Sequence, residues 1–147
     1  MSLHIRSGPW SPDATEAWLR STVIPLRIAT TGKRGPLVQS VWFVFEESTL
    51  WCATQRESVL ARRLRRDAQV GWEVAADLPP YRGARGTGRA TLVEEPERAE
   101  SVLRTLLARY GQEGSPLADW LLSRCATEVA VAIEDLHVVT WDYSPRM

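Results

Sequence analysis

Apolar residues recur at helical spacing in four stretches of the chain, and most of these stretches carry signals of a helix terminus. Ser11 and Ser115 each precede a proline, which suits an N-cap followed by the first helical position. Leu60 and Leu64 form an apolar pair one turn apart, and Gly111 ends a longer apolar repeat. The pattern predicts helices over about 12–21, 57–66, 96–110 and 116–125.

Six other stretches favour strands, because β-branched and aromatic residues dominate them or because apolar and polar residues alternate. They cover about 23–31, 36–45, 49–54, 68–76, 87–95 and 128–143, the last as one long or two short strands. A glycine-bracketed turn at 32–35 follows the first stretch, so we expect the first three strands to form an antiparallel meander. Two prolines and two glycines within 77–86 predict a long exposed loop.

Hairpin connections without strand–helix–strand alternation predict a mainly β protein, an antiparallel barrel of six strands with peripheral helices. The length of 147 residues suits a single domain spanning 1–147. Within it, the first helix at about 12–21 precedes a barrel at about 23–143.

Composition narrows the possible partners. The formal net charge is zero, which argues against a broad electrostatic contact with nucleic acid or an anionic membrane. No membrane-length apolar run or signal peptide is present, so we expect a cytoplasmic protein. Cys52 and Cys125 lie in apolar patterns and are expected to be reduced thiols.

Histidine and cysteine usage offers little for metal binding or acid–base catalysis. The only histidines are His4 and His137, and no CxxC pair is present, so no metal site is predicted. We expect His4 to be solvated near the terminus and His137 to be a satisfied strand residue. No Ser-His-Asp or Cys-His arrangement can be argued, and no catalytic side chain is predicted.

The segment from Thr54 to Arg66 is the candidate ligand site. A helix N-terminus offers unpaired N–H donors and a partial positive charge to an anion. Ser58 can add a hydroxyl, and Arg62 and Arg66 share one helical face. The alternative is that the four arginines of this helix, Arg62, Arg63, Arg65 and Arg66, form only a solvated face, which is at least as good an account of Arg65 and Arg66.

Several short segments, taken in order, resemble the pyridoxamine 5′-phosphate oxidase-like split-barrel family. Their order and spacing carry the resemblance, which is clearest over about 23–93 and returns near the C-terminus. The segments are 27–30 (RIAT), 41–45 (VWFVF), 50–54 (LWCAT), the turn at Ser58, 61–67 (ARRLRRD), 80–83 (PYRG), the Gly88 strand and 140–143 (TWDY).

The resemblance implies a homodimeric split barrel of six strands that holds FMN, or the deazaflavin F420, in each groove between subunits. It implies a flavoprotein oxidoreductase acting on a small organic molecule, with no nucleic acid or membrane partner. Trp42 and Trp141 would either stack near the groove or pack in the core, and Tyr81 and Arg82 would either close over the groove or form an exposed turn. The implied cofactor-binding residues are Arg27, Ile28, Ala29, Thr30, Ser40, Val41, Trp42, Ala53, Thr54, Ser58, Leu60, Arg62, Tyr81, Arg82 and Trp141.

The sequence departs from the family at three points. Members that hold FMN firmly usually carry Lys two positions after the serine, often preceded by a second basic residue, where this chain has Leu60 and Val59. Gly83 stands where oxidase members have a glutamine, and their substrate-binding basic residues find no match, so oxidation of pyridoxamine phosphate is not expected. Two hypotheses remain: a flavin-binding oxidoreductase, and a non-catalytic ligand-binding or sensory barrel, holding haem or no ligand, in which flavin binding is weak or lost.

Overall fold

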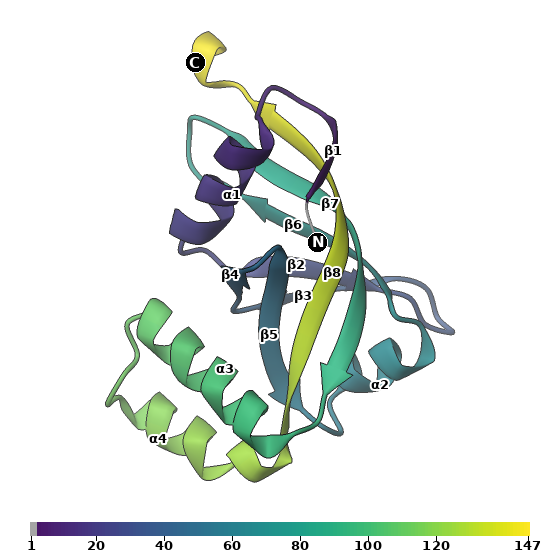
Figure 1. Ribbon diagram of the computed structural model, residues 1–147, viewed down its shortest axis with the longest axis vertical. Helices are drawn as coiled ribbons and strands as arrows, with labels where there is room; N and C mark the ends of the chain where they lie inside the picture. Colours follow the sequence, from purple (N-terminus) through teal and green to yellow (C-terminus); the bar gives the residue numbers. More distant parts are fainter. Residues whose placement is uncertain (1–2) are drawn as a thin grey trace.

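The protein, described over residues 3–147 by a computed structural model, is built on one curled sheet with helices against it (Figure 1). Its strands follow the order β3-β2-β6-β7-β8-β5-β4, and β1 pairs in parallel with β8. The remaining neighbours are antiparallel. The strands are β1 (His4–Ser7), β2 (Leu26–Thr30), β3 (Leu37–Val41), β4 (Val44–Glu46), β5 (Thr49–Gln55), β6 (Gln69–Ala75), β7 (Arg82–Val93) and β8 (Glu128–Asp142).

The mainly β, split-barrel class predicted from the sequence is confirmed, but the count of six strands was too low. One additional strand is β1, which carries too few apolar residues to be recognised. The other arises because the stretch 36–45 is two strands, β3 and β4, that lie at opposite edges of the sheet.

A bend at Trp42 and Phe43 separates these two edge strands. The Phe43 side chain is fully buried, and its main-chain N–H donates to the Tyr110 hydroxyl at 3.3 Å. The Trp42 ring stacks on the Tyr110 ring with centroids 4.7 Å apart. The predicted antiparallel pairing across the turn at 32–35 is confirmed by β2 and β3, but the predicted pairing of the second strand with the third is wrong, because the chain turns here to place Phe43 in the core and continues at the other edge of the sheet.

The predicted loop at 77–86 is also shorter than expected, since β7 begins at Arg82. Gly83 and Gly86 are strand residues at which neighbouring backbones approach closely. A Cβ on Gly83 would lie 2.8 Å from the Ala75 Cα, and one on Gly86 would lie 1.9 Å from the His137 carbonyl oxygen. Glycine is needed here for close strand packing rather than for a turn. The last predicted strand is a single long one, β8.

Four helices were predicted and all four are present: α1 (Pro12–Ser21), α2 (Val59–Arg66), α3 (Pro96–Arg109) and α4 (Pro116–Ser123). Ser11, Ser58 and Ser115 are the N-caps of α1, α2 and α4, and each accepts a hydrogen bond from a main-chain N–H three residues later. Short 3₁₀ turns follow at Cys125–Thr127 and Ser144–Arg146. No helix in residues 3–147 is long and apolar enough to cross a membrane.

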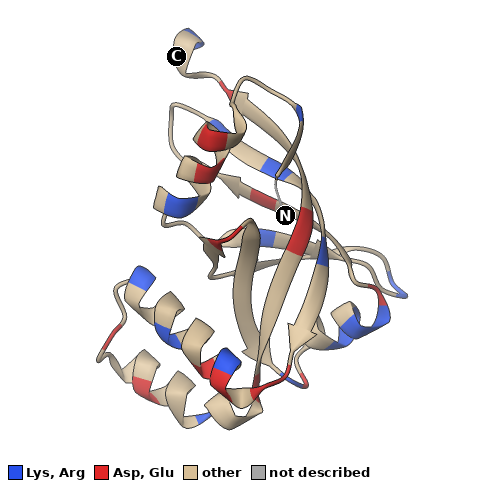
Figure 2. Ribbon diagram, viewed as in Figure 1, with Lys and Arg blue, Asp and Glu red and all other residues tan. Residues whose placement is uncertain are grey.

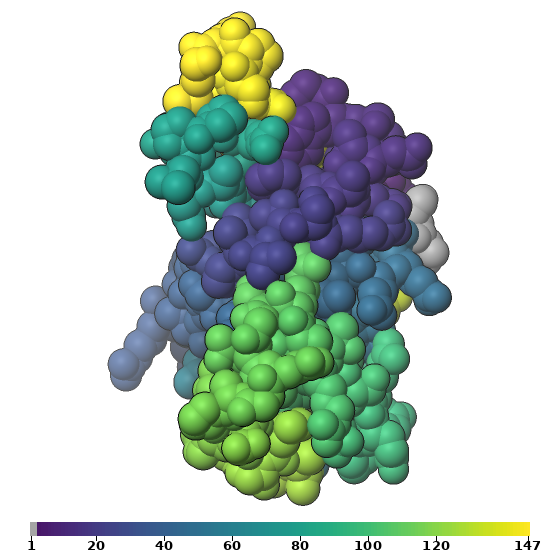
Figure 3. All heavy atoms as spheres, turned by 90° about the vertical axis from the view of Figure 1, so that its left-hand side faces the viewer, coloured from purple at the N-terminus to yellow at the C-terminus, as the bar shows by residue number. Residues whose placement is uncertain are grey.

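The barrel interior holds the main core, which includes Phe43, Cys52, Leu60 and Trp72. A second apolar cluster lies between the outer face of β5 and α3, and a third joins α3 to α4. Figure 3 shows α1 and the α3–α4 pair covering one side of the molecule. In residues 3–147 the main contacts of α1 and α3 with the sheet are to β4, β5 and β8, and α4 packs against α3, so these three helices leave the outward face of β2, β6 and β7 uncovered.

Candidate functional site

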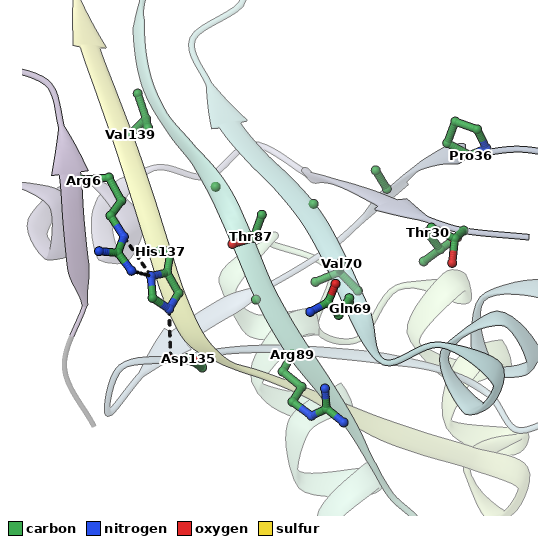
Figure 4. Close-up of a pocket in the computed structure, with 15 residues that line it drawn as sticks. Arg6, Thr30, Pro36, Gln69, Val70, Thr87, Arg89, Asp135, His137 and Val139 are labelled. Atoms are coloured by element: carbon green, nitrogen blue, oxygen red, sulfur yellow. Dashed lines mark hydrogen bonds and ion pairs between the residues drawn. The ribbon is translucent and has the colours of Figure 1, made fainter.

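A cavity of about 830 Å³ lies on this uncovered face of the sheet. Side chains from β2, β6, β7 and β8 and from Arg6 of β1 surround it (Figure 4). Its volume lies within the range of small-molecule and cofactor sites, about 300–1,000 Å³. The lining residues are Arg6, Ala29, Thr30, Thr31, Pro36, Gln69, Val70, Gly71, Gly86, Thr87, Gly88, Arg89, Asp135, His137 and Val139.

Gly71, Gly86 and Gly88 line the cavity, but only Gly71 lies on the face where a side chain would enter it; Gly86 and Gly88 pair with the core residues Trp72 and Val70. Gly86 and Gly88 are required by the fold, since a Cβ on Gly88 would lie 2.7 Å from the Ile133 Cγ2 atom and Gly86 meets β8 as described above. At Gly71, by contrast, an added Cβ would make ordinary contact, 3.5 Å from the Ala29 Cβ. The fold therefore tolerates a side chain at Gly71, whereas the cavity would lose space.

Polar and charged groups also line the cavity. The Thr30 hydroxyl is buried and finds no hydrogen-bond partner within residues 3–147, which is costly, and a turn of this side chain toward the cavity would let a bound group supply one. Arg6 and Arg89 place guanidinium groups at the cavity, from β1 and β7 respectively, and both are exposed. The cavity thus combines an unsatisfied hydroxyl with two cations, a set that suits an anionic, hydrogen-bonding ligand.

The β2 end of the cavity is held in place by α2. The Arg63 guanidinium donates to the carbonyl oxygens of Thr30 and Gly35, at 3.4 and 3.3 Å. Asp67, which follows α2, accepts from the Gln69 main-chain N–H at 3.0 Å and from the Thr31 hydroxyl at 2.9 Å. These two hydrogen bonds lower the pKa of the Asp67 carboxyl, so this contact is kept at neutral pH.

The predicted anion site at the start of α2 has a well-formed helix end. The Ser58 hydroxyl caps α2 by accepting from the Ala61 N–H at 3.0 Å, and the Thr54 hydroxyl donates to it at 2.8 Å. Figure 2 shows Lys and Arg gathered on α2, whereas charges of both signs are mixed on the other elements. Arg62 is exposed, but Leu60 lies in the barrel core with 2% of its surface accessible.

Only two of the predicted cofactor-binding residues, Ala29 and Thr30, line the large cavity. Trp141 lines a smaller hollow near the C-terminus, and the Arg85 guanidinium lies 4.9 Å from its ring centroid. Tyr81 and Arg82 are exposed, with the Arg82 guanidinium 5.4 Å from the Trp18 ring. The remaining predicted residues lie in three places. Ile28, Trp42 and Ala53 belong to apolar clusters, and Arg27, Ser40 and Val41 lie on the paired strands β2 and β3. Thr54, Ser58 and Arg62 surround the start of α2.

Sequence reasoning missed a polar cluster at the β1–β8 end of the cavity. It contains both histidines of the chain, His4 and His137, together with Asp135 and Arg6. The alternation of 135, 137 and 139 on one face of β8 was a usable signal for part of it. The pairing of β1 with β8, which brings His4 opposite His137, left no local signal in the sequence.

The curled antiparallel sheet with helices on one side places the chain in the split-barrel class. A family model described as pyridoxamine 5′-phosphate oxidase matches residues 12–137, and the protein belongs to this family. No curated protein matches the chain.

Solved structures agree with this assignment. A conserved hypothetical protein from Mycobacterium tuberculosis, Rv2991, is 25% identical and has a TM-score of 0.78, over 92% of this chain and 86% of that one. A protein named F420 reductase is 21% identical with a TM-score of 0.69, over 84% and 94%. A protein from Mesorhizobium loti named as FAD-binding is 16% identical with a TM-score of 0.65, over 88% and 92%. The last two likenesses concern the fold.

Proposed function

We propose that the protein is a flavin-binding oxidoreductase with FMN or F420 as its cofactor, working as a homodimer on a small organic molecule. The observation that carries this proposal is the cavity on the uncovered sheet face, with glycines in its lining and the unpaired Thr30 hydroxyl in its wall. Membership of the oxidase family and the names of two structural relatives support a flavin-type ligand.

The residues of this chain would bind and orient the cofactor rather than exchange protons with a substrate. A bound flavin or deazaflavin supplies the hydride chemistry. A planar ring can lie against Gly71, where no side chain intervenes, and the Thr30 hydroxyl can hydrogen-bond to it once its side chain turns toward the ligand. Arg89 can offer charge-assisted hydrogen bonds to an anionic part of the ligand.

The cofactor phosphate has two possible positions in this proposal. One is the start of α2, where Ser58 and the first-turn N–H groups face an incoming anion and Arg62 adds charge. The other is the cavity, near Arg89. An eight-residue helix is about 12 Å long, and the cavity adjoins the opposite end of α2, so the two positions can be separated by mutation.

Two variants test the proposal without disturbing the core. Ser58→Asp keeps an efficient N-cap but places a negative charge where a phosphate would bind. Gly71→Val suits a strand and adds a side chain to the cavity. The matched control is Ser115→Asp, because Ser115 caps α4 through the same hydrogen bond, 3.1 Å long.

The experiment is a titration of the purified full-length protein with FMN and with F420, followed by fluorescence. We expect saturable binding of one cofactor, and a loss of at least about tenfold, or 1.4 kcal/mol, in Gly71→Val, in Ser58→Asp or in both. Ser115→Asp should bind like the wild type. Absence of saturable binding of either cofactor would refute the proposal, and so would equal affinity in all three variants. Light scattering on the same samples tests the dimer.

The second candidate is a ligand-binding barrel that has lost its flavin, and the position of Leu60 favours it. Leu60 occupies the place where the resemblance implies a phosphate-binding lysine, and its side chain is part of the core. Val59, the position before it, is 52% exposed at the start of α2. If the native protein binds neither cofactor but Val59→Lys binds FMN, the site is a degenerate flavin pocket.

A further inference from the structure

The polar cluster at the β1–β8 end of the cavity has the composition of a metal site. Its ligand-bearing residues are His4 from β1 and Asp135 and His137 from β8. His4 and His137 are paired across the parallel β1–β8 register, and their rings stack with centroids 4.7 Å apart. Two imidazoles and one carboxylate form a ligand set used for zinc and neighbouring transition metals.

The distances within the cluster are close to those of a coordinated ion. The Asp135 Oδ1 atom lies 3.2 Å from the His137 Nε2 atom and 3.6 Å from the His4 Nε2 atom. All three ligand atoms lie within 4.8 Å of one another. In a tetrahedral site with bonds of 2.0–2.2 Å, ligand atoms are about 3.3–3.6 Å apart. The stacked rings of His4 and His137 do not point at a common ion, so the exposed His4 side chain must turn out of the stack for its Nε2 atom to complete the site.

The backbone conformation of Asp135 supports a role beyond the fold. Its φ angle is +51°, in the left-handed region that residues other than glycine adopt at a cost. It lies where β8 and β7 slip out of register, between the pairs Thr87–His137 and Arg89–Glu134. Such bulges re-aim side chains, and here the exposed Asp135 carboxylate is directed at both histidines.

In its observed position, the Arg6 side chain opposes metal binding by His137. Its guanidinium donates to the His137 Nδ1 atom, through Nε at 2.9 Å and also through Nη2. This contact leaves the ring proton on Nε2, where it points at Asp135 (Figure 4). A metal ion at Nε2 requires the ring proton on Nδ1, so Arg6 must turn away and a hydrogen-bond acceptor would serve better in its place.

We propose that His4, Asp135 and His137 form a binding site for one divalent transition-metal ion of the zinc type, with the Arg6 side chain as a competing partner of His137. The three protein ligands leave a fourth position open, on the side where Asp135 and His137 line the cavity. The site shares Asp135 and His137 with the cavity lining, but its occupancy can be measured with no flavin present, so its failure and that of the proposed function are distinguishable.

The test is a titration of the untagged full-length protein with Zn²⁺ by calorimetry and with Co²⁺ by visible absorption. Because the chain has two histidines, the imidazole NMR signals report directly on both candidate ligands. We expect one ion per chain, and shifts of both imidazole signals on adding Zn²⁺. His4→Gln, His137→Gln and Asp135→Asn should each lose at least about tenfold in affinity, the loss typical even of an outer-shell partner. Asparagine tolerates positive φ, so Asp135→Asn keeps the backbone.

Two further variants make the result specific to this site. Arg6→Gln removes the competing donor and supplies an amide oxygen, so it should bind Zn²⁺ more tightly than the wild type. Asp77→Asn, in the exposed loop before β7, should leave the affinity unchanged. The proposal is overturned if no 1:1 binding is seen, if only one imidazole signal responds, or if Asp135→Asn binds Zn²⁺ as tightly as Asp77→Asn does. Thermal melts of each apo variant check that the fold is intact.

Discussion

The buried carboxyl of Glu128 should make the protein less stable at neutral pH than in mild acid. Glu128 begins β8 opposite Gln55, and 4% of its surface is accessible. Its Oε2 atom is buried and has no hydrogen-bond partner in the part of the chain that the structure describes. Burial raises the pKa of this carboxyl, and the nearby Arg124 and Gln55 side chains offset only part of that effect.

The sign and size of the effect follow from proton linkage. Between the ordinary glutamate pKa of 4.5 and the raised value, the folded protein holds a proton that the unfolded chain has released. The free energy of unfolding therefore falls as pH rises through this window, by at most about 1.4 kcal/mol per pH unit, and levels off above it. Because glutamine carries no charge at any of these pH values, Glu128→Gln should be more stable than the wild type at pH 7, by about 1.4 kcal/mol for each unit by which burial raises the Glu128 pKa.

Urea unfolding at a series of pH values from 4 to 8 measures this directly, since the difference between the wild type and Glu128→Gln isolates one carboxyl. The two proteins should be nearly equal near pH 4 and diverge as pH rises. Glu113→Gln, which changes an exposed acid between α3 and α4, should stay parallel to the wild type. If Glu128→Gln keeps the pH slope of the wild type, or is the less stable protein at pH 7, the reasoning is wrong.

Three further outcomes are expected. Burial raises the pKa of Cys52 to about 12, so a thiol reagent should modify one cysteine, Cys125, in the native protein and the second only in denaturant; rapid reaction of both would contradict this. Glu47 and Ser48 form the β4–β5 turn with φ of +49° and +60°, so Glu47→Asn with Ser48→Gly should raise the free energy of unfolding by about 1–2 kcal/mol in urea, and no gain would refute it. The Arg109 guanidinium donates to three main-chain carbonyls at the end of α1, at 2.6, 3.2 and 2.6 Å. Arg109→Ala should therefore cost about 2–4 kcal/mol, and Arg109→Lys less; equal losses would argue against a role for the planar fork.

The helices were predictable because their signals are local. A serine followed by proline, or by an apolar repeat, sets the start of each of α1, α2 and α4 within a few residues of the cap. The strand content was also predictable, and so was the β2–β3 hairpin around its glycine-bracketed turn, but the neighbours of strands distant in sequence were not. The sequence of 36–45 does not show that the chain bends before β4 so that Phe43 enters the core. This bend is required only by the assembled barrel.

The loop predicted over 77–86 was too long for a related reason. Gly83 and Gly86 resemble loop residues in a single sequence, whereas in the barrel they allow β7 to approach β6 and β8. For the same reason, only part of the candidate site could be predicted from the sequence. The start of α2 was located by helix-end chemistry, but the cavity and the His4–His137 pair depend on strands from distant parts of the chain lying side by side.

The bend at Trp42 and Phe43 has a consequence for how the barrel can open. Because β3 and β4 are the two edges of the sheet, these two residues tie its edges together with about 10 Å of chain. The edges cannot separate widely unless Phe43 leaves the core and Trp42 leaves Tyr110. The amides of β3 and β4 should then exchange with solvent in one cooperative event, and a protease cut at this link should convert the closed sheet into one that can unroll.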